Sequence, residues 1–109
     1  MKAGIVIYKR VGTLLVGKWA HEDSLGLFSE EIVRDVQLGT WEGDWPVEIF
    51  QERKLIFRGR LNSVKLGDCL KLKWQQEPDS DGGARIFQGI GYAIDAETVA
   101  ASFELIEPN

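Results

Sequence analysis

The chain has little of what most metal and catalytic sites are made from. Its 109 residues include one cysteine, Cys69, and one histidine, His21. A lone cysteine excludes an intrachain disulfide, and these two residues lack the close spacing of a zinc-ligand set. His21 lies in a segment that reads as an exposed turn, and no serine sits in a nucleophile elbow. We therefore predict no metal, no cofactor and no catalytic residue. The unpaired cysteine indicates a cytoplasmic protein.

Long apolar runs and excess positive charge are also missing. No stretch approaches the roughly 18 apolar residues of a membrane-spanning helix. The apolar run near the N-terminus is shorter than the roughly 7–15 residues of a signal-peptide core. The net charge is -4, with 13 Lys and Arg against 17 Asp and Glu, whereas binding a phosphate backbone requires clustered cations. These absences predict neither a membrane nor a nucleic-acid partner.

What the chain does have is an apolar residue at every second position, the period of a strand with one buried face. In residues 54–61, Phe57 and Leu61 share one face, and Arg58 and Arg60 share the other. The same alternation recurs in two later segments, residues 69–75 and 99–105. Glycine, asparagine and aspartate divide the chain into about eight such segments with short connections. We therefore predict an all-β fold with a single domain over residues 1–109, an antiparallel meander β-barrel of about eight strands.

Some segments of this barrel are less clear than others. Residues 29–36 read either as a strand or as a single helical turn, because Ser29 is a good N-cap while the β-branched residues favour a strand. In residues 85–94 the even-numbered residues from Ile86 to Ile94 share one face, which we expect to be the inner one. We also expect a short strand over residues 25–28, a bulge near residues 62–63 and a polar loop over residues 77–83.

The predicted interior is rich in aromatic side chains. Apolar cavities lined by aromatic rings and a few polar groups are how proteins hold small ligands, although small barrels are commonly filled by side chains. We predict a non-catalytic binding protein for a small apolar or amphipathic ligand, whose polar end Gln88 or Tyr92 would fix. The predicted ligand-binding residues are Trp41, Phe57, Trp74, Gln88, Tyr92 and Phe103.

The alternative function is a protein-interaction or regulatory module with a solid barrel core. An exposed apolar patch of Phe50, Ile56 and Ile106 would then serve a homodimer or another protein partner. An enzyme would need carboxylates clustered inside the barrel, and the alternation predicts them outside. Two acidic groups are candidates to meet a basic partner: Glu42, Asp44 and Glu48, and residues 22–23 with residues 30–31.

Residues 38–105 resemble the calycin superfamily of meander barrels, which includes lipocalins, fatty-acid-binding proteins and the avidin type. The segments that carry the resemblance are Gly39-Thr40-Trp41 and residues 55–61, 70–74, 87–91 and 102–105. The resemblance implies a closed barrel with a ligand site inside it. The avidin type places an Asn and a Ser that contact biotin soon after the tryptophan, where this chain has Glu42, Gly43 and Asp44. Biotin binding is therefore not implied.

Overall fold

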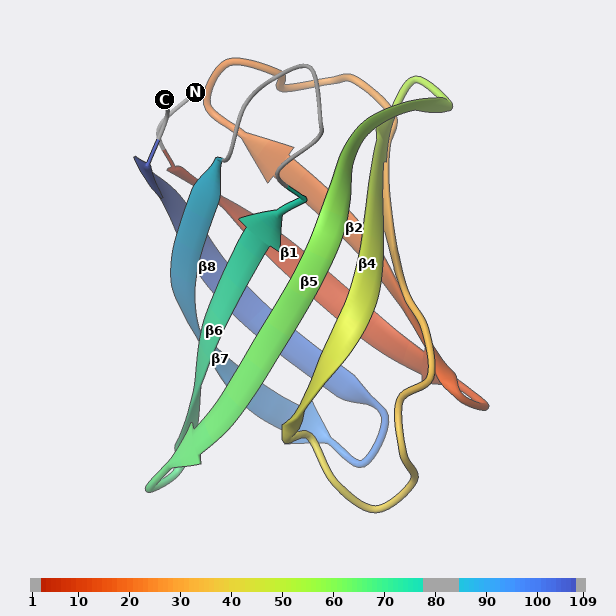
Figure 1. Cartoon of the computed structure of the whole chain (residues 1–109), viewed down its shortest axis with the longest axis vertical. Helices are drawn as coiled ribbons and strands as arrows, with labels where there is room; N and C mark the ends of the chain where they lie inside the picture. Colours follow the sequence, from red (N-terminus) through yellow and green to blue (C-terminus); the bar gives the residue numbers. More distant parts are fainter. Residues whose placement is uncertain (1–2, 78–84, 108–109) are drawn as a thin grey trace.

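The computed structural model describes residues 3–77 and 85–107, and within these ranges it contains strands and no helix. Figure 1 shows the strands winding around a common axis. Their bounds are β1 Ala3–Val11, β2 Leu14–His21, β3 Ser29–Val33, β4 Gly43–Gln51, β5 Lys54–Leu66, β6 Cys69–Gln76, β7 Ile86–Asp95 and β8 Thr98–Glu107.

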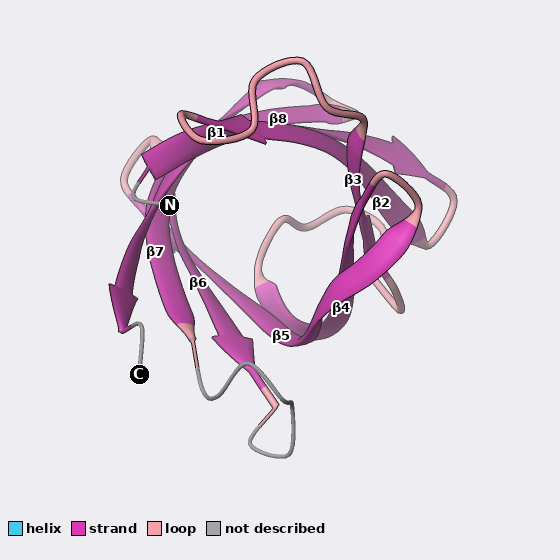
Figure 2. Cartoon of the chain, turned by 90° about the horizontal axis from the view of Figure 1, so that it is seen from above, coloured by secondary structure: helices cyan, strands magenta, loops and turns pink. Residues whose placement is uncertain are grey.

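Each strand pairs antiparallel with its neighbours in sequence, and β8 pairs with β1 to close the barrel. The end-on view shows this ring of strands (Figure 2). Closure occurs along a full register, from Ala3 opposite Glu104 to Lys9 opposite Thr98. It leaves no long unpaired strand edge to template aggregation. The predicted fold, an all-β meander barrel of eight antiparallel strands, is confirmed.

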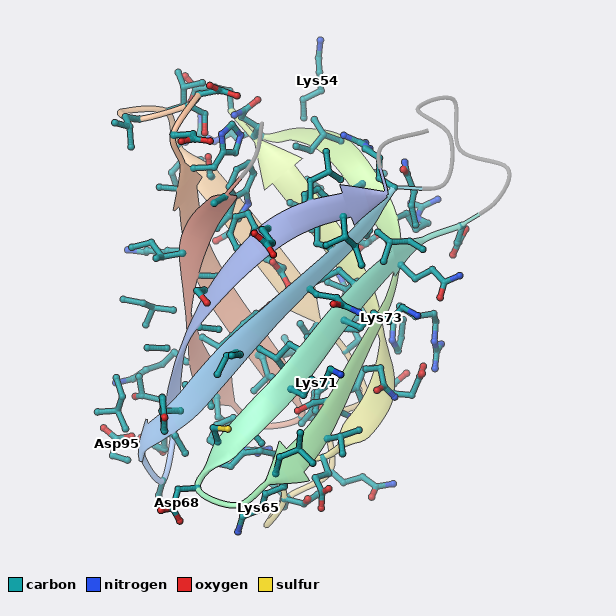
Figure 3. The ribbon with its side chains drawn as sticks, turned by 90° about the vertical axis from the view of Figure 1, so that its left-hand side faces the viewer. Lys54, Lys65, Asp68, Lys71, Lys73 and Asp95 are labelled. Atoms are coloured by element: carbon teal, nitrogen blue, oxygen red, sulfur yellow. The ribbon has the colours of Figure 1, made fainter. Side chains whose placement is uncertain are left out.

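The two-residue alternation sorts side chains between the lumen and the solvent on most strands. On β6, Leu70, Leu72 and Trp74 are buried. Lys71 and Lys73 point away from the barrel (Figure 3). The predicted inner faces of β6 and β8 are confirmed, and that of β5 is confirmed from Phe57 to Leu61, whereas Leu55, predicted on the same face, is exposed.

Charged side chains on the outer surface of β4 and β5 pair with one another. Arg60 Nε lies 2.7 Å from Asp44 Oδ1, and Arg58 Nη2 lies 3.1 Å from Glu48 Oε2. The lysines labelled in Figure 3 are instead spread from one end of the barrel to the other. The outer surface thus carries mixed charge, and the lysines labelled on the side of the barrel drawn in Figure 3 do not gather into one basic patch.

The two ends of the barrel differ. One end, which we call the packed end, holds the β1–β2, β3–β4, β5–β6 and β7–β8 connections, and aliphatic side chains pack inside it. Arg10 helps to close it, because its guanidinium lies 4.3 Å from the Trp41 ring centroid and donates to the Thr40 carbonyl at 2.7 Å. The aliphatic residues packed there include Leu15, Val33, Val36, Leu70 and Val99.

Two local predictions need correction, and one that was left open is decided in favour of a strand. The ambiguous segment at residues 29–36 contains a strand, β3, whereas residues 25–28 form no strand. No bulge interrupts β5 at residues 62–63, because Leu61 and Ser63 both continue its inner face. The irregularity lies near the start of β5 instead, where Ile56 is the extra residue between two successive pairs with β4. Apart from Glu77, the predicted loop over residues 77–83 lies outside the described residues.

The predicted inner face of β7 is wrong. Phe87 and Gly91 point inward and are buried, whereas Tyr92 is 57% exposed on the outside. The strand approaches β8 so closely at Gly89 that a Cβ there would lie 1.7 Å from the Ser102 backbone oxygen. The inward face therefore carries glycine where the curvature of the barrel leaves no room for a side chain. Because glycines stand on this inner face in place of apolar side chains, the alternation in the sequence does not reveal it.

Gly89→Ala should destabilise the barrel by at least about 2 kcal/mol, since the backbone of β7 or β8 must move to admit the new carbon. Gly91→Ala is the matched control on the same inner face, because its Cβ would meet its nearest atoms at 3.2 Å. Urea denaturation measures both free energies of unfolding. Equal losses in the two variants would contradict the tight approach at Gly89.

Candidate functional site

The barrel is hollow at the end where β2, β4, β6 and β8 finish, which we call the cavity end. The cavity has a volume of about 290 Å³, near the lower limit of roughly 300 Å³ for ligand pockets. His21, Gln51 and Arg85 form its rim and are partly exposed, so the cavity reaches solvent at this end. Deeper lining residues are Trp19, Glu31, Ile49, Ile56, Phe57, Trp74, Phe87 and Phe103.

One wall of the cavity is a continuous series of aromatic rings. Phe57 packs edge-on against Phe87, Phe87 against Phe103, and Phe103 against Trp74, with centroids about 6 Å apart. Trp19 lines the cavity from β2. Edge-to-face contacts fix the orientation of each ring, so the wall is preformed rather than assembled around a ligand.

Glu31 is the most unusual residue of the cavity. Its side chain points into the lumen from β3 and is 3% exposed. Tyr8 on β1 donates its hydroxyl hydrogen to Glu31 Oε2, and the Trp74 indole on β6 donates to the same oxygen at 2.8 Å. Trp74 Nε1 also lies 3.0 Å from the Tyr8 hydroxyl. These three residues, which we call the polar crossbar, join β1, β3 and β6 across the lumen.

Burial controls the protonation of the crossbar. Loss of solvent raises the pKa of Glu31 to about 7, although the hydrogen bonds from Tyr8 and Trp74 oppose the shift. Burial, together with the neighbouring Glu31 carboxylate, raises the pKa of Tyr8 well above its ordinary value. Tyr8 therefore remains a phenol donor at neutral pH, while Glu31 changes charge near neutrality.

Two of the three polar side chains at the rim, Arg85 and His21, make defined contacts. Arg85 donates from Nε to Gln76 Oε1 at 3.0 Å and from Nη2 to the Ile56 carbonyl at 2.8 Å, both neutral acceptors. His21 stacks on Trp19 with centroids 5.4 Å apart. Partial burial lowers the pKa of His21 despite the nearby Asp23 carboxylate. His21 is thus the final residue of β2 at the cavity rim, and the predicted exposed turn begins after it.

The irregular pairing at the start of β5 brings neighbouring side chains to one cavity. In a regular strand Ile56 and Phe57 would face opposite sides, yet both line the cavity. The extra residue rotates the strand locally, as bulges do next to binding sites. Ile56 therefore does not belong to the outer dimer patch that the alternation predicts for it.

Half of the predicted ligand-binding residues meet at this cavity: Phe57, Trp74 and Phe103 line it. Trp41 does not, because β4 begins at Gly43 and the ring lies at the packed end under Arg10. Gln88 and Tyr92 face outward on β7, for the reason given above. Gln88 borders a separate hollow of about 520 Å³, which Ile90 and Ser102 also line.

The polar group inside the cavity is Glu31 rather than the predicted Gln88, which lies on the outside of the barrel wall. Glu31 belonged to a predicted acidic surface group, yet it is the carboxylate inside the lumen. The strand interpretation of residues 29–36 held the necessary signal, since Ser29 and Glu31 share the parity of buried Val33. The prediction that Glu31 lies on the outer surface is therefore wrong.

Two other features were sought among the described residues: a metal-binding cluster and a membrane-spanning helix. Within residues 3–77 and 85–107, no three histidine, cysteine or acidic side chains gather in a group that would hold a metal ion. In the same part of the chain, no helix has the length and hydrophobicity needed to cross a membrane.

Comparison with known proteins adds no relative. No protein-family model matches this chain, and the searches of curated proteins and of solved structures also gave no match. The functional argument therefore depends on the cavity alone.

Glu31→Gln should change how stability depends on pH. A carboxyl pKa raised from 4.5 to about 7 means that the folded state holds its proton more tightly, so ionisation destabilises it progressively as pH rises through this interval. The full effect above pH 7 is about 3 kcal/mol. Glutamine accepts the same hydrogen bonds without ionising, so the variant should gain stability over the native protein between pH 4.5 and pH 7.

Urea denaturation across this pH range measures the difference. Glu30→Gln is the matched control, since it removes the same charge from the outward-facing neighbour on β3. A difference between native protein and Glu31→Gln that stays constant with pH would contradict the raised pKa.

Proposed function

We propose that this protein is a non-catalytic binding protein whose barrel holds a small apolar or amphipathic ligand at the cavity end. The observation that carries this proposal is the hollow interior itself, about 290 Å³ lined largely by aromatic and aliphatic side chains. A small barrel that served only as a scaffold would have filled that space to gain packing energy. The polar crossbar marks the inner end of the cavity and the rim marks its entrance.

The ligand's apolar body would lie against the ring series from Phe57 to Trp74. Burying apolar surface stabilises a complex by roughly 25 cal/mol per Å² before the losses of association. Polar contacts would come from Glu31 at depth and from Arg85 at the rim, in place of Gln88 and Tyr92. A relationship to calycin barrels is part of this proposal, supported by the closed meander and by a cavity at one end. A cytoplasmic location is also a proposal.

The alternative, a protein-interaction module with a solid core, has weaker support. The core is not solid at the cavity end, and the acidic side chains of Asp44 and Glu48 are paired within the chain. The apolar surface that would suit a partner or a second copy differs from the predicted patch, because it crosses β1, β8 and β7. Its exposed large residues include Ile5, Ile7, Ile90, Tyr92 and Ile94.

Blocking the cavity tests the proposal. Native protein should bind 2-phenylethanol, a small neutral probe with one aromatic ring, at a single saturable site measured by isothermal titration calorimetry. Ile49→Trp replaces an aliphatic side chain of the cavity lining with a larger indole ring. It should weaken binding of the probe by at least about tenfold, which is about 1.4 kcal/mol of binding free energy.

The control is Phe50→Trp, which introduces the same indole ring at the adjacent residue. Phe50 does not line the cavity. This control variant should bind the probe as the native protein does. Failure of the native protein to bind, or equal binding by Ile49→Trp, would overturn the proposed function.

A further inference from the structure

The Glu31 carboxyl group lacks a counter-charge. None of the ion pairs among the described residues includes it, and both hydrogen bonds that it accepts come from neutral donors, Tyr8 and Trp74. Both also fall on Oε2. The second oxygen, Oε1, accepts no hydrogen bond from the described residues, although the side chain is 3% exposed and lines the cavity. Buried carboxylates are normally paired or fully hydrogen-bonded.

The surroundings of this oxygen favour a cation. Aromatic faces attract positive charge, and an ammonium group is held best where rings surround it. Trp74 and Trp19 line the same cavity as Glu31, and the rings of Phe103, Phe87 and Phe57 continue from Trp74 toward the rim. A carboxylate at depth with aromatic walls above it matches a molecule with a cationic end and an apolar body.

We propose that the cavity binds small primary amines with an aromatic or alkyl body, and that Glu31 Oε1 accepts a hydrogen bond from the ammonium group. This inference rests on the proposed function and names the class of ligand. Glu31 is a binding residue in it, and Tyr8 and Trp74 position its carboxylate.

An anionic ligand is the competing choice, because Arg85 stands at the rim. Two observations count against it. Two of the five N–H donors of Arg85 are already engaged, Nε by Gln76 and one on Nη2 by the Ile56 carbonyl. An acid that entered the cavity would also face the Glu31 carboxylate in a poorly solvated space, where like charges repel strongly. A carboxylate ligand would therefore stay at the rim and leave the ring series uncovered.

Amine affinity should depend on pH through Glu31. The other titratable groups around it are Tyr8, which stays protonated, and His21 and Arg85 at the rim, neither of which contributes to the shift of the Glu31 pKa. Below pH 7 the carboxyl must lose a proton before it can pair with an ammonium. With a pKa of about 7, affinity should rise about tenfold from pH 6 to pH 8.

Isothermal titration calorimetry with three probes of similar size tests the inference. The probes are 2-phenylethylamine, the neutral 2-phenylethanol and the anionic 3-phenylpropanoate. At pH 8 the amine should bind native protein at least tenfold more tightly than the alcohol, and the acid least tightly. Glu31→Gln should reduce amine affinity at least tenfold and abolish its pH dependence, with alcohol affinity changed less than twofold. Glu30→Gln should behave as native protein.

Each other result has a distinct meaning. Equal binding of the amine and the alcohol would overturn this inference and leave the proposed function standing. Tightest binding of the acid would overturn it in favour of recognition at Arg85. Binding of none of the three probes would overturn both the inference and the proposed function. Glutamine preserves the crossbar acceptor, and thermal melting confirms that the variant is folded before titration.

Discussion

Burial of the Glu31 carboxyl group is the constraint on which the hollow half of this barrel depends. An ionised carboxyl in a closed apolar interior is strongly unfavourable unless donors stabilise it. Tyr8 and Trp74 supply those donors from β1 and β6, so three strands distant in sequence are held at fixed separation. The same contacts leave the second carboxyl oxygen without a donor among the described residues, in a side chain that lines the cavity. The Glu31 side chain thus both ties the three strands together and offers an oxygen that can still accept a hydrogen bond.

The packed end and the cavity end divide stability and binding between them. Aliphatic side chains such as Val33 and Val99 pack inside the packed end, and Arg10 holds the β3–β4 connection over it. The cavity end uses large rigid rings, whose edge-to-face contacts support one another without filling the centre. A well-packed region that carries the free energy of folding permits a neighbouring region to stay open.

The period of two residues was sufficient to predict the meander and the inner faces of most strands, because polar and apolar side chains alternate clearly there. That is why Phe57, Trp74 and Phe103 were identified as cavity candidates. The same period gives the wrong inner face for β7, where the inner face carries Gly89 and the outer face carries Tyr92. Steric crowding against β8 decides that strand, and hydrophobicity cannot reveal it.

The predicted positions of Glu31 and Trp41 are also wrong, and in both cases tertiary contacts are the reason. Glu31 is buried because donors from distant strands reach it, and nothing adjacent in sequence announces them. Trp41 follows the parity of β4 but precedes its first residue, and the stacked Arg10 places it at the packed end. The closed architecture was therefore predictable from local patterns. The parity of β3 also places Glu31 on the inner face, whereas its hydrogen-bond donors Tyr8 and Trp74 are brought to it only by the folded arrangement.

The most direct test of this account is the titration of Glu31 followed by carbon-13 NMR of its side-chain carboxyl carbon, with the resonance assigned by its absence in Glu31→Gln. The account predicts a midpoint near pH 7, because the group is buried against neutral donors. A midpoint near the ordinary value of 4.5 would show a well-solvated carboxyl, and would contradict both the polar crossbar and a cavity built around it.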